Sequence, residues 1–561
     1  MAMPLRAGAM TLSACAPSTA GSFPNWLTPV GEELFFTAND NLHGEEVWRS
    51  DGTHDGTVLV RDIDPHAGWY EERYTAGPEG LLNVGGTLFF SEYHSPAGRA
   101  LWKTDGSRAG TVMVADPDPS TTDSYYTGPK GLRDVAGTLF FLVDRDDLRE
   151  LWKSDGTTPG TTLVTQLPGE GFRATELTGV GDTLFFTASD ETHGRELWKS
   201  DGTEAGTVMV KDIAPGADDS GLFDLTAEGD ALFFNADDGA QGRELWRSDG
   251  TEAGTVMVKD IMPGAGGSDP VQLTHEEDTF FFSADDGAHG RELWKSDGTE
   301  AGTVMVADIR PGSAGSDASW METLDGAVFF DARDGVHGNE LWVSDGSAAG
   351  THMVKDLSSS TRYAPDDLTP LGGRMFFTLG TQRTDQLWSS DGSEDGTTLV
   401  RTVGGPHETW GLTATSARLF FRADDGIHGP ELWTSDGTTD GTSLVRDISD
   451  GAGFWEHGQT HHHRRGTITL FFEAFKDGRL TLSPVDGSPV RRVVRDVRRG
   501  SGPEVVLRPT RAGMRELRRA LRRAHHQGQQ VGRLDVTVRV TYTPCGLPSS
   551  SKLRHYTLKL R

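Results

Sequence analysis

Three observations predict an all-β protein: a β-propeller of four-stranded blades, followed by a small β-sandwich-like domain with one helix. First, a Glu-Leu-Trp motif followed by Ser-Asp-Gly-Thr or a close variant recurs along the chain, as in Glu292–Thr299. Second, a Phe-Phe doublet precedes most copies, as at Phe233-Phe234. Third, the tryptophans recur every 45 to 54 residues, which is the size of a propeller blade; they are Trp48, Trp102, Trp152, Trp198, Trp246, Trp294, Trp342, Trp388 and Trp433.

Each repeat predicts four antiparallel strands. In the regular repeat 271–309, four short apolar runs are separated by turns that contain Gly or Asp, which tight hairpins use. Neighbouring residues of a strand point to opposite faces, so Phe281 and Phe282 make both faces of the sheet apolar. A ring of equivalent blades covers both faces of every sheet. The four runs are Val271–Thr274, Thr279–Ser283, Glu292–Ser296 and Val304–Ile309.

The repeats do not fix the number of blades. Nine units exceed the usual 4 to 8 blades of a propeller. One large ring, an eight-bladed ring with a divergent end unit, and two smaller rings are therefore all compatible with the pattern. The first three units have the most irregular spacing, so we expect any imperfection of the array there.

Charge divides the chain into two main parts. Residues 466–561 carry 20 Lys+Arg and 7 Asp+Glu, so the 33 and 76 that remain give residues 1–465 a net charge of −43. We expect a leader and linker in residues 1–22, the repeat propeller in residues 23–460 and a basic domain in residues 466–561. The acidic repeats would repel phosphate backbones, so we expect no nucleic-acid partner.

The basic C-terminal region predicts short strands and one Arg-rich helix. Strand-like runs are Gly478–Leu482, Val506–Thr510 and Val536–Pro544, and the arginines gather around 511–523, where a solvated helix face is the simpler interpretation. A small β-sandwich fits this order. A degenerate tenth blade over Arg479–Val497 is the alternative.

The repeated string resembles the bacterial ELWxxDGT repeat family. Its motif ELW-x-SDGT-x-x-GT-x-x-VKDI stands almost unaltered at Glu196–Ile213, Glu244–Ile261 and Glu292–Ile309. The resemblance covers about 430 residues and implies a surface or secreted protein, often a lipoprotein, with no defined activity carried by the motif. The C-terminal region is similar to small β-sandwich modules appended to actinobacterial exported proteins.

The N-terminus contains a candidate lipid anchor. Leu12-Ser13-Ala14-Cys15, followed by a polar linker, resembles a bacterial lipoprotein signal in which the cysteine is lipidated. The apolar part is shorter than in a typical signal, so either the start lies too far downstream or the match is accidental. With lipidation at Cys15 we expect a lipid-anchored cell-envelope protein, and otherwise an extracellular one. No run approaches the roughly 20 apolar residues of a transmembrane helix.

Paired aspartates suggest a metal. Calcium prefers 6 to 8 oxygen ligands, which clustered carboxylates supply. The candidate ligands are the Asp-Asp-Gly pairs Asp237 and Asp238, Asp285 and Asp286, and Asp424 and Asp425. No unit has the D-x-D-x-D-G spacing that wraps one ion, so a solvated hairpin is the alternative. We expect no other cofactor.

The repeated residues favour structural roles. One tryptophan per blade at the same strand position suits packing between blades better than a ligand platform. In the Ser-Asp-Gly-Thr turns, the Asp and Thr side chains are expected to cap the turn's own amides. No nucleophile with a base, and no singular carboxylate pair, breaks the repeat. We therefore expect no catalytic residue and a non-enzymatic protein that binds a protein or glycan partner through propeller loops; the alternative is an exported hydrolase or lyase acting on polysaccharide.

Overall fold

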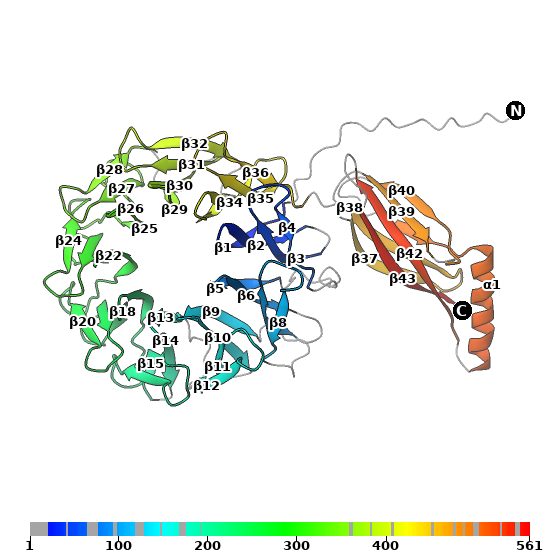
Figure 1. The fold of residues 1–561 in the computed structure, drawn as a ribbon, viewed down its shortest axis with the longest axis horizontal. Helices are drawn as coiled ribbons and strands as arrows, with labels where there is room; N and C mark the ends of the chain where they lie inside the picture. Colours follow the sequence, from blue (N-terminus) through cyan, green and yellow to red (C-terminus); the bar gives the residue numbers. More distant parts are fainter. Residues whose placement is uncertain are drawn as a thin grey trace.

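The computed structural model shows one ring of nine four-stranded antiparallel sheets, followed by a separate two-sheet unit (Figure 1). The all-β, β-propeller fold is therefore confirmed. The structure describes residues 21–561 except 41–42, 64–76, 94–97, 118–127, 146–147, 168–175, 191, 358–362, 382–383, 405–408, 450–453, 475–477, 486–487, 498–503, 528–529 and 545–549. Cys15 lies outside the described residues.

Each blade consists of four consecutive strands. Blades 1 to 3 are β1 (Asn25–Val30), β2 (Glu33–Asn39), β3 (Glu45–Ser50), β4 (Val58–Leu59); β5 (Glu79–Val84), β6 (Thr87–Tyr93), β7 (Arg99–Thr104), β8 (Val112–Ala115); and β9 (Pro129–Val135), β10 (Thr138–Arg145), β11 (Leu148–Ser154), β12 (Thr162–Leu167). Blades 4 to 6 are β13 (Thr178–Val180), β14 (Thr183–Asp190), β15 (Gly194–Ser200), β16 (Val208–Lys211); β17 (Phe223–Glu228), β18 (Ala231–Asp237), β19 (Arg243–Ser248), β20 (Val256–Lys259); and β21 (Val271–Glu276), β22 (Thr279–Asp285), β23 (Arg291–Ser296), β24 (Val304–Ala307). Blades 7 to 9 are β25 (Ser319–Leu324), β26 (Ala327–Ala332), β27 (Glu340–Ser344), β28 (His352–Lys355); β29 (Pro365–Leu371), β30 (Arg374–Gly380), β31 (Asp385–Ser390), β32 (Thr398–Val403); and β33 (Trp410–Ala414), β34 (Leu419–Asp424), β35 (Pro430–Ser435), β36 (Ser443–Arg446).

The first strands of successive blades contact one another around the ring, and β33 of blade 9 contacts β1 of blade 1. The first strand of each blade is thus the innermost, as Figure 1 shows. This closed contact selects one nine-bladed ring from the three arrangements that the repeats left open.

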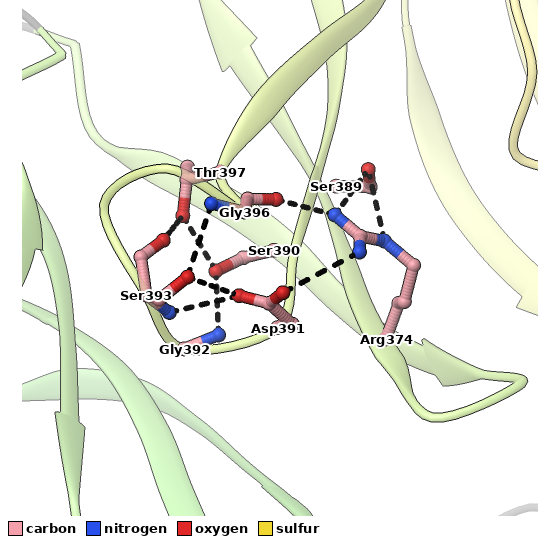
Figure 2. Close-up of polar contacts among 8 residues, drawn as sticks. All are labelled: Arg374, Ser389, Ser390, Asp391, Gly392, Ser393, Gly396 and Thr397. Carbon is pink, nitrogen blue, oxygen red and sulfur yellow. Dashed lines mark hydrogen bonds and ion pairs between the residues drawn. The ribbon is translucent and has the colours of Figure 1, made fainter.

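The Ser-Asp-Gly-Thr turn is held by its own side chains, as predicted. In blade 8 (Figure 2), Asp391 Oδ1 accepts hydrogen bonds from the amide of Ser393 at 3.0 Å and from its hydroxyl at 2.7 Å. Ser390 Oγ accepts from the amide of Gly392 at 3.0 Å and lies 2.7 Å from Thr397 Oγ1. Every polar residue of the motif therefore has a partner within the turn.

The glycine of this turn also contacts the preceding blade. Gly298 has φ +80°, which favours glycine, and a Cβ there would lie 3.0 Å from Cζ of Phe233. Phe233 is the first ring of the doublet in blade 5, so the doublet and the turn of the next blade fit together.

Basic residues at the end of the repeat join neighbouring blades. Lys211 of blade 4 donates to the Thr255 carbonyl of blade 5 at 2.8 Å and lies 5.8 Å from the Trp246 ring. Arg446 of blade 9 donates to the Thr57 carbonyl of blade 1 at 2.6 Å. The same contact thus links blades within the array and across the closure of the ring.

The glutamate of Glu-Leu-Trp binds the segment that leads to the next blade. Glu244 accepts from the amide of Ile261 at 3.0 Å and from the amide of Ser268 at 3.1 Å. At the closure, Glu431 accepts from the amide of Ser22 at 3.0 Å, across 409 residues of sequence. Burial raises the pKa of Glu431 to about 7. Ser22 therefore performs for blade 1 the role that Ser268 performs for blade 6.

The motif tryptophans lie between blades, as predicted. Trp294 is 6% exposed and packs with Phe233 and Leu245 of the preceding blade. Five others are equally buried, at 9% exposure or less: Trp48, Trp102, Trp246, Trp342 and Trp433.

The C-terminal unit contains two sheets and one helix. Its three-stranded sheet has the order β37-β38-β41 and its four-stranded sheet the order β40-β39-β42-β43. The two sheets share a core that includes Ile468, Leu482, Val538 and Leu558, which is the arrangement of a sandwich. The elements are β37 (Phe454–His462), β38 (Thr467–Ala474), β39 (Gly478–Pro484), β40 (Val493–Val497), β41 (Glu504–Leu507), α1 (Arg511–His526), β42 (Gly532–Pro544) and β43 (Ser550–Leu560).

Strand pairing places Phe454–His462 in this unit, because β37 pairs with β38. Strand β39 pairs with β42, which follows helix α1 in the sequence. Arg479–Val497 therefore belongs to the sandwich and forms no tenth blade. No helix among the described residues is long and apolar enough to cross a membrane.

Candidate functional site

In each blade, one residue in the innermost strand, or in blade 4 just before it, departs from β geometry. These nine residues have positive φ, between +52° and +75°, and we name them the axial residues: Trp26, Gly80, Gly131, Glu176, Asp224, Gln272, Trp320, Asp367 and Gly411. Most of them lie at the irregularity in the pairing of the first and second strands, as between Phe223 and Thr226. Each is followed by a leucine or, in blade 7, by Met321.

The left-handed conformation makes six of these positions unusual. Only glycine adopts it without strain, and other residues are less stable there by about 1 to 2 kcal/mol. Glycine occupies the position in blades 2, 3 and 9, which shows that the fold accepts it. The six other side chains are therefore not required by the backbone, and strained positions of this kind occur preferentially at functional sites.

The axial residues also break the repeat. Blades 5, 6 and 7 share nearly all of their motif residues, but their axial residues are Asp224, Gln272 and Trp320. Five consecutive blades, 4 to 8, carry polar or aromatic side chains at this position, and we name this set the axial arc: Glu176, Asp224, Gln272, Trp320 and Asp367. Glycines fill three of the four remaining positions. The ring therefore has one side with side chains and one side that is nearly bare.

Solvent reaches the aromatic members of the set. Trp320 is 50% exposed and Trp26 is 45% exposed, in contrast to the motif tryptophans. An exposed indole face binds apolar groups and cations. These two tryptophans lie outside the Glu-Leu-Trp motif, so the repeat pattern did not predict a ligand platform at either of them.

The axial carboxylates contact the next blade. Asp224 Oδ2 accepts from the amide of Gln272 at 3.1 Å, and Asp367 Oδ2 accepts from the amide of Gly411 at 2.6 Å. Burial raises the pKa of Glu176, Asp224 and Asp367. A carboxylate whose pKa is raised by desolvation gains from a cation that approaches its charged form.

A further group of acids occurs only in blades 7 and 8. Burial, with a smaller contribution from the charge of Asp366, raises the pKa of Asp331 to about 6. Asp331 accepts hydrogen bonds from Ser319 Oγ and from Asn339 Nδ2. Asp366 is exposed overall, but part of its carboxyl group is shielded from water by its neighbours, and this desolvation raises its pKa. With the adjacent Asp367, Asp331 and Asp366 form a cluster of carboxyl groups. The sequence pattern did not reveal this cluster, because Asp331 and Asp366 are 35 residues apart in sequence.

The six aspartates predicted to bind calcium lie in three separate turns, between the second and third strands of blades 5, 6 and 9. In each pair both carboxylates accept amide hydrogens of their own turn. Asp285 accepts from Gly287 N at 2.8 Å, and Asp286 accepts from His289 N at 2.8 Å and lies 2.7 Å from His289 Nδ1. Asp237 and Asp424 match Asp285, and Asp238 and Asp425 match Asp286.

These turns do not bring the carboxylates of different blades together. Within the described ranges, no group of three or more His, Cys, Asp or Glu side chains is arranged to hold a metal ion. Although burial opposes it, hydrogen bonds from His289 lower the pKa of Asp286, which therefore stays charged. Calcium binding at these turns stays a prediction, with the hydrogen-bonded hairpin as the observed arrangement.

No protein-family model matches the chain, and no curated protein matches it. The resemblance to the ELWxxDGT repeat family stays a prediction. Similar solved structures include a puromycin hydrolase (17% identity, 64% of this chain and 60% of that chain, TM-score 0.35). Others are a prolyl endopeptidase (12%, 71% and 54%, 0.38) and prolyl oligopeptidase B from Galerina marginata (9%, 71% and 56%, 0.38).

These structures are described as a hydrolase and peptidases. That finding contradicts the expected non-enzymatic protein that binds a protein or glycan partner through its loops, and also the alternative that acts on polysaccharide. The chain spans 60% or less of the length of each. At 9 to 17% identity and TM-scores below 0.5, the likeness shows the propeller fold alone.

Proposed function

We propose that the ring binds short cationic peptides, or other small organic cations, at the axial arc. One observation carries this proposal: the side chains of the arc differ from blade to blade at a backbone position that the fold also fills with glycine. A residue kept at a strained position for packing would recur with the rest of the motif. These side chains do not recur, so the repeat does not require them, and a ligand cation would bind carboxylates that also accept an amide hydrogen of the next blade.

The chemistry of the arc favours a cation. Glu176, Asp224 and Asp367 supply carboxylates, and Trp320 supplies an exposed aromatic face. Ammonium and guanidinium groups form charge-assisted hydrogen bonds with the first and cation–π contacts with the second. The net charge of −43 over residues 1–465 would raise the local concentration of cations. A short cationic peptide is the simplest ligand that offers both ammonium groups and apolar surface.

This function differs from both of those that the comparisons contradict. The ligand is a small cation instead of a protein or glycan partner. It binds on the innermost strands instead of the loops.

Fluorescence anisotropy with fluorescein-labelled tetralysine tests the proposal, with tetraglutamate as the negative control. We expect Asp224→Asn and Asp367→Asn to weaken binding about 3- to 10-fold each, because each removes one charge of a partly exposed ion pair while keeping an acceptor oxygen. Asp230→Asn, an exposed aspartate of the same blade as Asp224, is the matched control and should leave binding unchanged.

The pH dependence gives a second readout. Since burial raises the pKa values of the arc carboxyls, lowering the pH protonates them earlier than ordinary carboxyls, and tetralysine should bind more tightly at pH 8 than at pH 5. Equal weakening by the control and the two arc variants would show that binding reflects net charge alone, and would refute the site.

Hydrolysis of the bound ligand is a second candidate function. The observation that favours it is the cluster of carboxyl groups in blades 7 and 8, where burial raises the pKa of Asp331 to about 6 and exposed Asp366 lies close enough for its charge to act on Asp331. Mass spectrometry of a peptide mixture incubated at pH 6 tests it. Cleavage that Asp366→Asn abolishes while tetralysine binding persists would support it. A mixture left intact by the wild type would refute hydrolysis and leave the binding proposal standing.

A further inference from the structure

Helix α1 (Arg511–His526) presents a stripe of arginines to solvent. Its buried residues, Gly513, Leu517 and Ala524, face the sandwich, and Thr510 caps its N-terminus by accepting from Gly513 N at 3.1 Å. At 100° per residue, the exposed arginines at i, i+4, i+7, i+8 and i+11 fall within about 100° of arc. We name these five the basic stripe: Arg511, Arg515, Arg518, Arg519 and Arg522.

The stripe is not neutralised within the C-terminal unit. Glu516 is the one acidic residue of the helix, and its position lies off the stripe. Among the described residues, no acidic side chain forms an ion pair with the five arginines. Residues 466–561 carry a net charge of +13, with 20 Lys+Arg and 7 Asp+Glu. A row of uncompensated arginines repels itself, so an acidic partner would stabilise it.

The helix lies at the end of the sandwich that is remote from the propeller linker. The linker enters at Phe454, which pairs with Ala474. Gly478, four residues further along the chain, pairs with Pro544 at the end of β42. The backbone of Leu521 lies against Gly532, at the opposite end of β42. Those ends are about 40 Å apart for a 13-residue strand. The helix therefore faces outward, away from the ring of its own chain (Figure 1).

The propeller carries the complementary surface. In blades 4 to 6, each blade has one aspartate in the turn between its first two strands, and an aspartate and a glutamate in the turn between its last two. Antiparallel strands place both turns on the same rim. These nine exposed acids form what we name the acidic rim: Asp182, Asp230, Asp278, Asp201, Asp249, Asp297, Glu204, Glu252 and Glu300.

The rim keeps its charge. Hydrogen bonds from Thr299 lower the pKa of Asp297, and the equivalent bonds lower those of Asp201 and Asp249. Lys153 and Arg247 offset part of the charge of Asp201 and Asp249, but the nine acids of the rim outnumber them. Negative charge therefore dominates this rim.

We infer that the basic stripe docks on the acidic rim of a second copy of this chain. Charge complementarity selects this partner: the stripe and the rim occur in equal numbers on every molecule, and the outward position of α1 offers it to another molecule. A membrane surface is less suited, because the apolar face of the helix is packed against the sandwich and cannot enter the lipid. Single-stranded nucleic acid is less suited, because the stripe has no aromatic residue for bases to stack on.

The contact joins two different surfaces, so it is heterologous. It closes into a symmetric pair only if both helices reach the opposite rims at once, and it otherwise produces open chains. In either case exposed charges form it, so salt screens it.

Sedimentation velocity of the full chain tests the inference. In 20 mM salt we expect association, and in 500 mM salt a dissociation constant at least about tenfold higher. R515E/R518E/R522E should abolish association. R491E/R492E/R495E makes the same charge change at exposed residues near β40 and is the matched control, which should leave association intact.

A charge exchange makes the test specific. E204K/E252K/E300K should not associate alone and should associate again when mixed with R515E/R518E/R522E. The inference would be overturned by a wild type that stays monomeric in 20 mM salt, or by a control triple variant that dissociates as fully as the stripe variant. Binding of monomeric wild type to vesicles with 30% phosphatidylserine or to duplex DNA, lost in R515E/R518E/R522E, would also overturn it in favour of those partners.

Discussion

Replacing Trp294 by alanine is expected to lower the free energy of unfolding by about 3 kcal/mol. The side chain is 6% exposed and packs between blades against Phe233, Leu245 and Phe282. Truncation of a large buried aromatic residue costs about 3 to 5 kcal/mol. The indole Nε1 is buried without a hydrogen-bond partner among the described residues, and burying such a group costs about 1 to 3 kcal/mol. Truncation removes that unfavourable term as well, which places the expected loss at the lower end of the range.

Guanidinium chloride unfolding followed by circular dichroism measures this loss, with Trp320→Ala as the matched control. Trp320 is 50% exposed at the ring axis, so its removal should change stability by less than about 0.5 kcal/mol. The two variants delete the same side chain from the same kind of repeat. Equal destabilisation of both, or near-wild-type stability of Trp294→Ala, would refute the packing role assigned to the motif tryptophan.

Three further predictions follow from the repeat. Gly298→Ala should destabilise the fold by about 1 kcal/mol more than Gly326→Ala in the same assay. Both glycines have φ near +80°, but a Cβ at Gly298 would lie 3.0 Å from Phe233, whereas a Cβ at Gly326 would have nothing within 4 Å. Equal destabilisation by the two variants would exclude the contact with Phe233. Burial raises the pKa of Glu431 from 4.5 to about 7, so its protonated form stabilises the fold fully below pH 4.5 and this contribution is lost as the pH rises through 7. Between pH 5 and pH 8 the wild type should therefore lose up to about 3 kcal/mol more than Glu431→Gln, and parallel profiles would contradict the shift. Millimolar calcium should raise the Tm relative to chelator if the Asp-Asp-Gly turns bind it, and an unchanged Tm would leave them as hydrogen-bonded hairpins.

The sequence predicts the blade well because the blade is local. Two-residue alternation explains why both rings of Phe281-Phe282 are buried, and the turn residues explain the hairpins. The hydrogen bonds of the Ser-Asp-Gly-Thr turn connect residues at most seven apart, as Ser390 and Thr397 show. Interactions this close in sequence leave a pattern that one repeat is enough to reveal.

Closure of the ring is a long-range property that one repeat does not reveal. The contact of Ser22 with Glu431 spans 409 residues, and Ser22 lies before the first recognisable blade. A signal was nevertheless present: Gly21-Ser22 corresponds to Gly267-Ser268, which precedes the first strand of blade 6. Aligning that dipeptide would have predicted that blade 1 joins blade 9 as any other pair joins.

The axial residues were missed for a different reason. Their common property is a positive φ, which sequence periodicity does not display when the residue is Trp320 or Asp367 instead of glycine. The position can still be found, since each axial residue stands directly before a leucine or Met321 at the start of its blade. Comparing that one column across nine repeats separates it from the columns that packing fixes.

The separation between fold and function follows from where the repeat uses its polar groups. The glutamate, serine, aspartate and threonine of the motif are bound within their turn or to the next blade, and the lysine of blade 4, Lys211, is bound to a carbonyl of blade 5. Groups already engaged in this way would have to give up those contacts to bind a ligand, and nine blades would lose them alike. A ligand site is therefore expected where the side chains differ from blade to blade, and where glycine in other blades shows that the fold requires no particular side chain. Asp224→Asn and Asp367→Asn keep an acceptor oxygen for the amide of the next blade, so they should change affinity while leaving the ring intact, whereas variants of the motif should change the ring first.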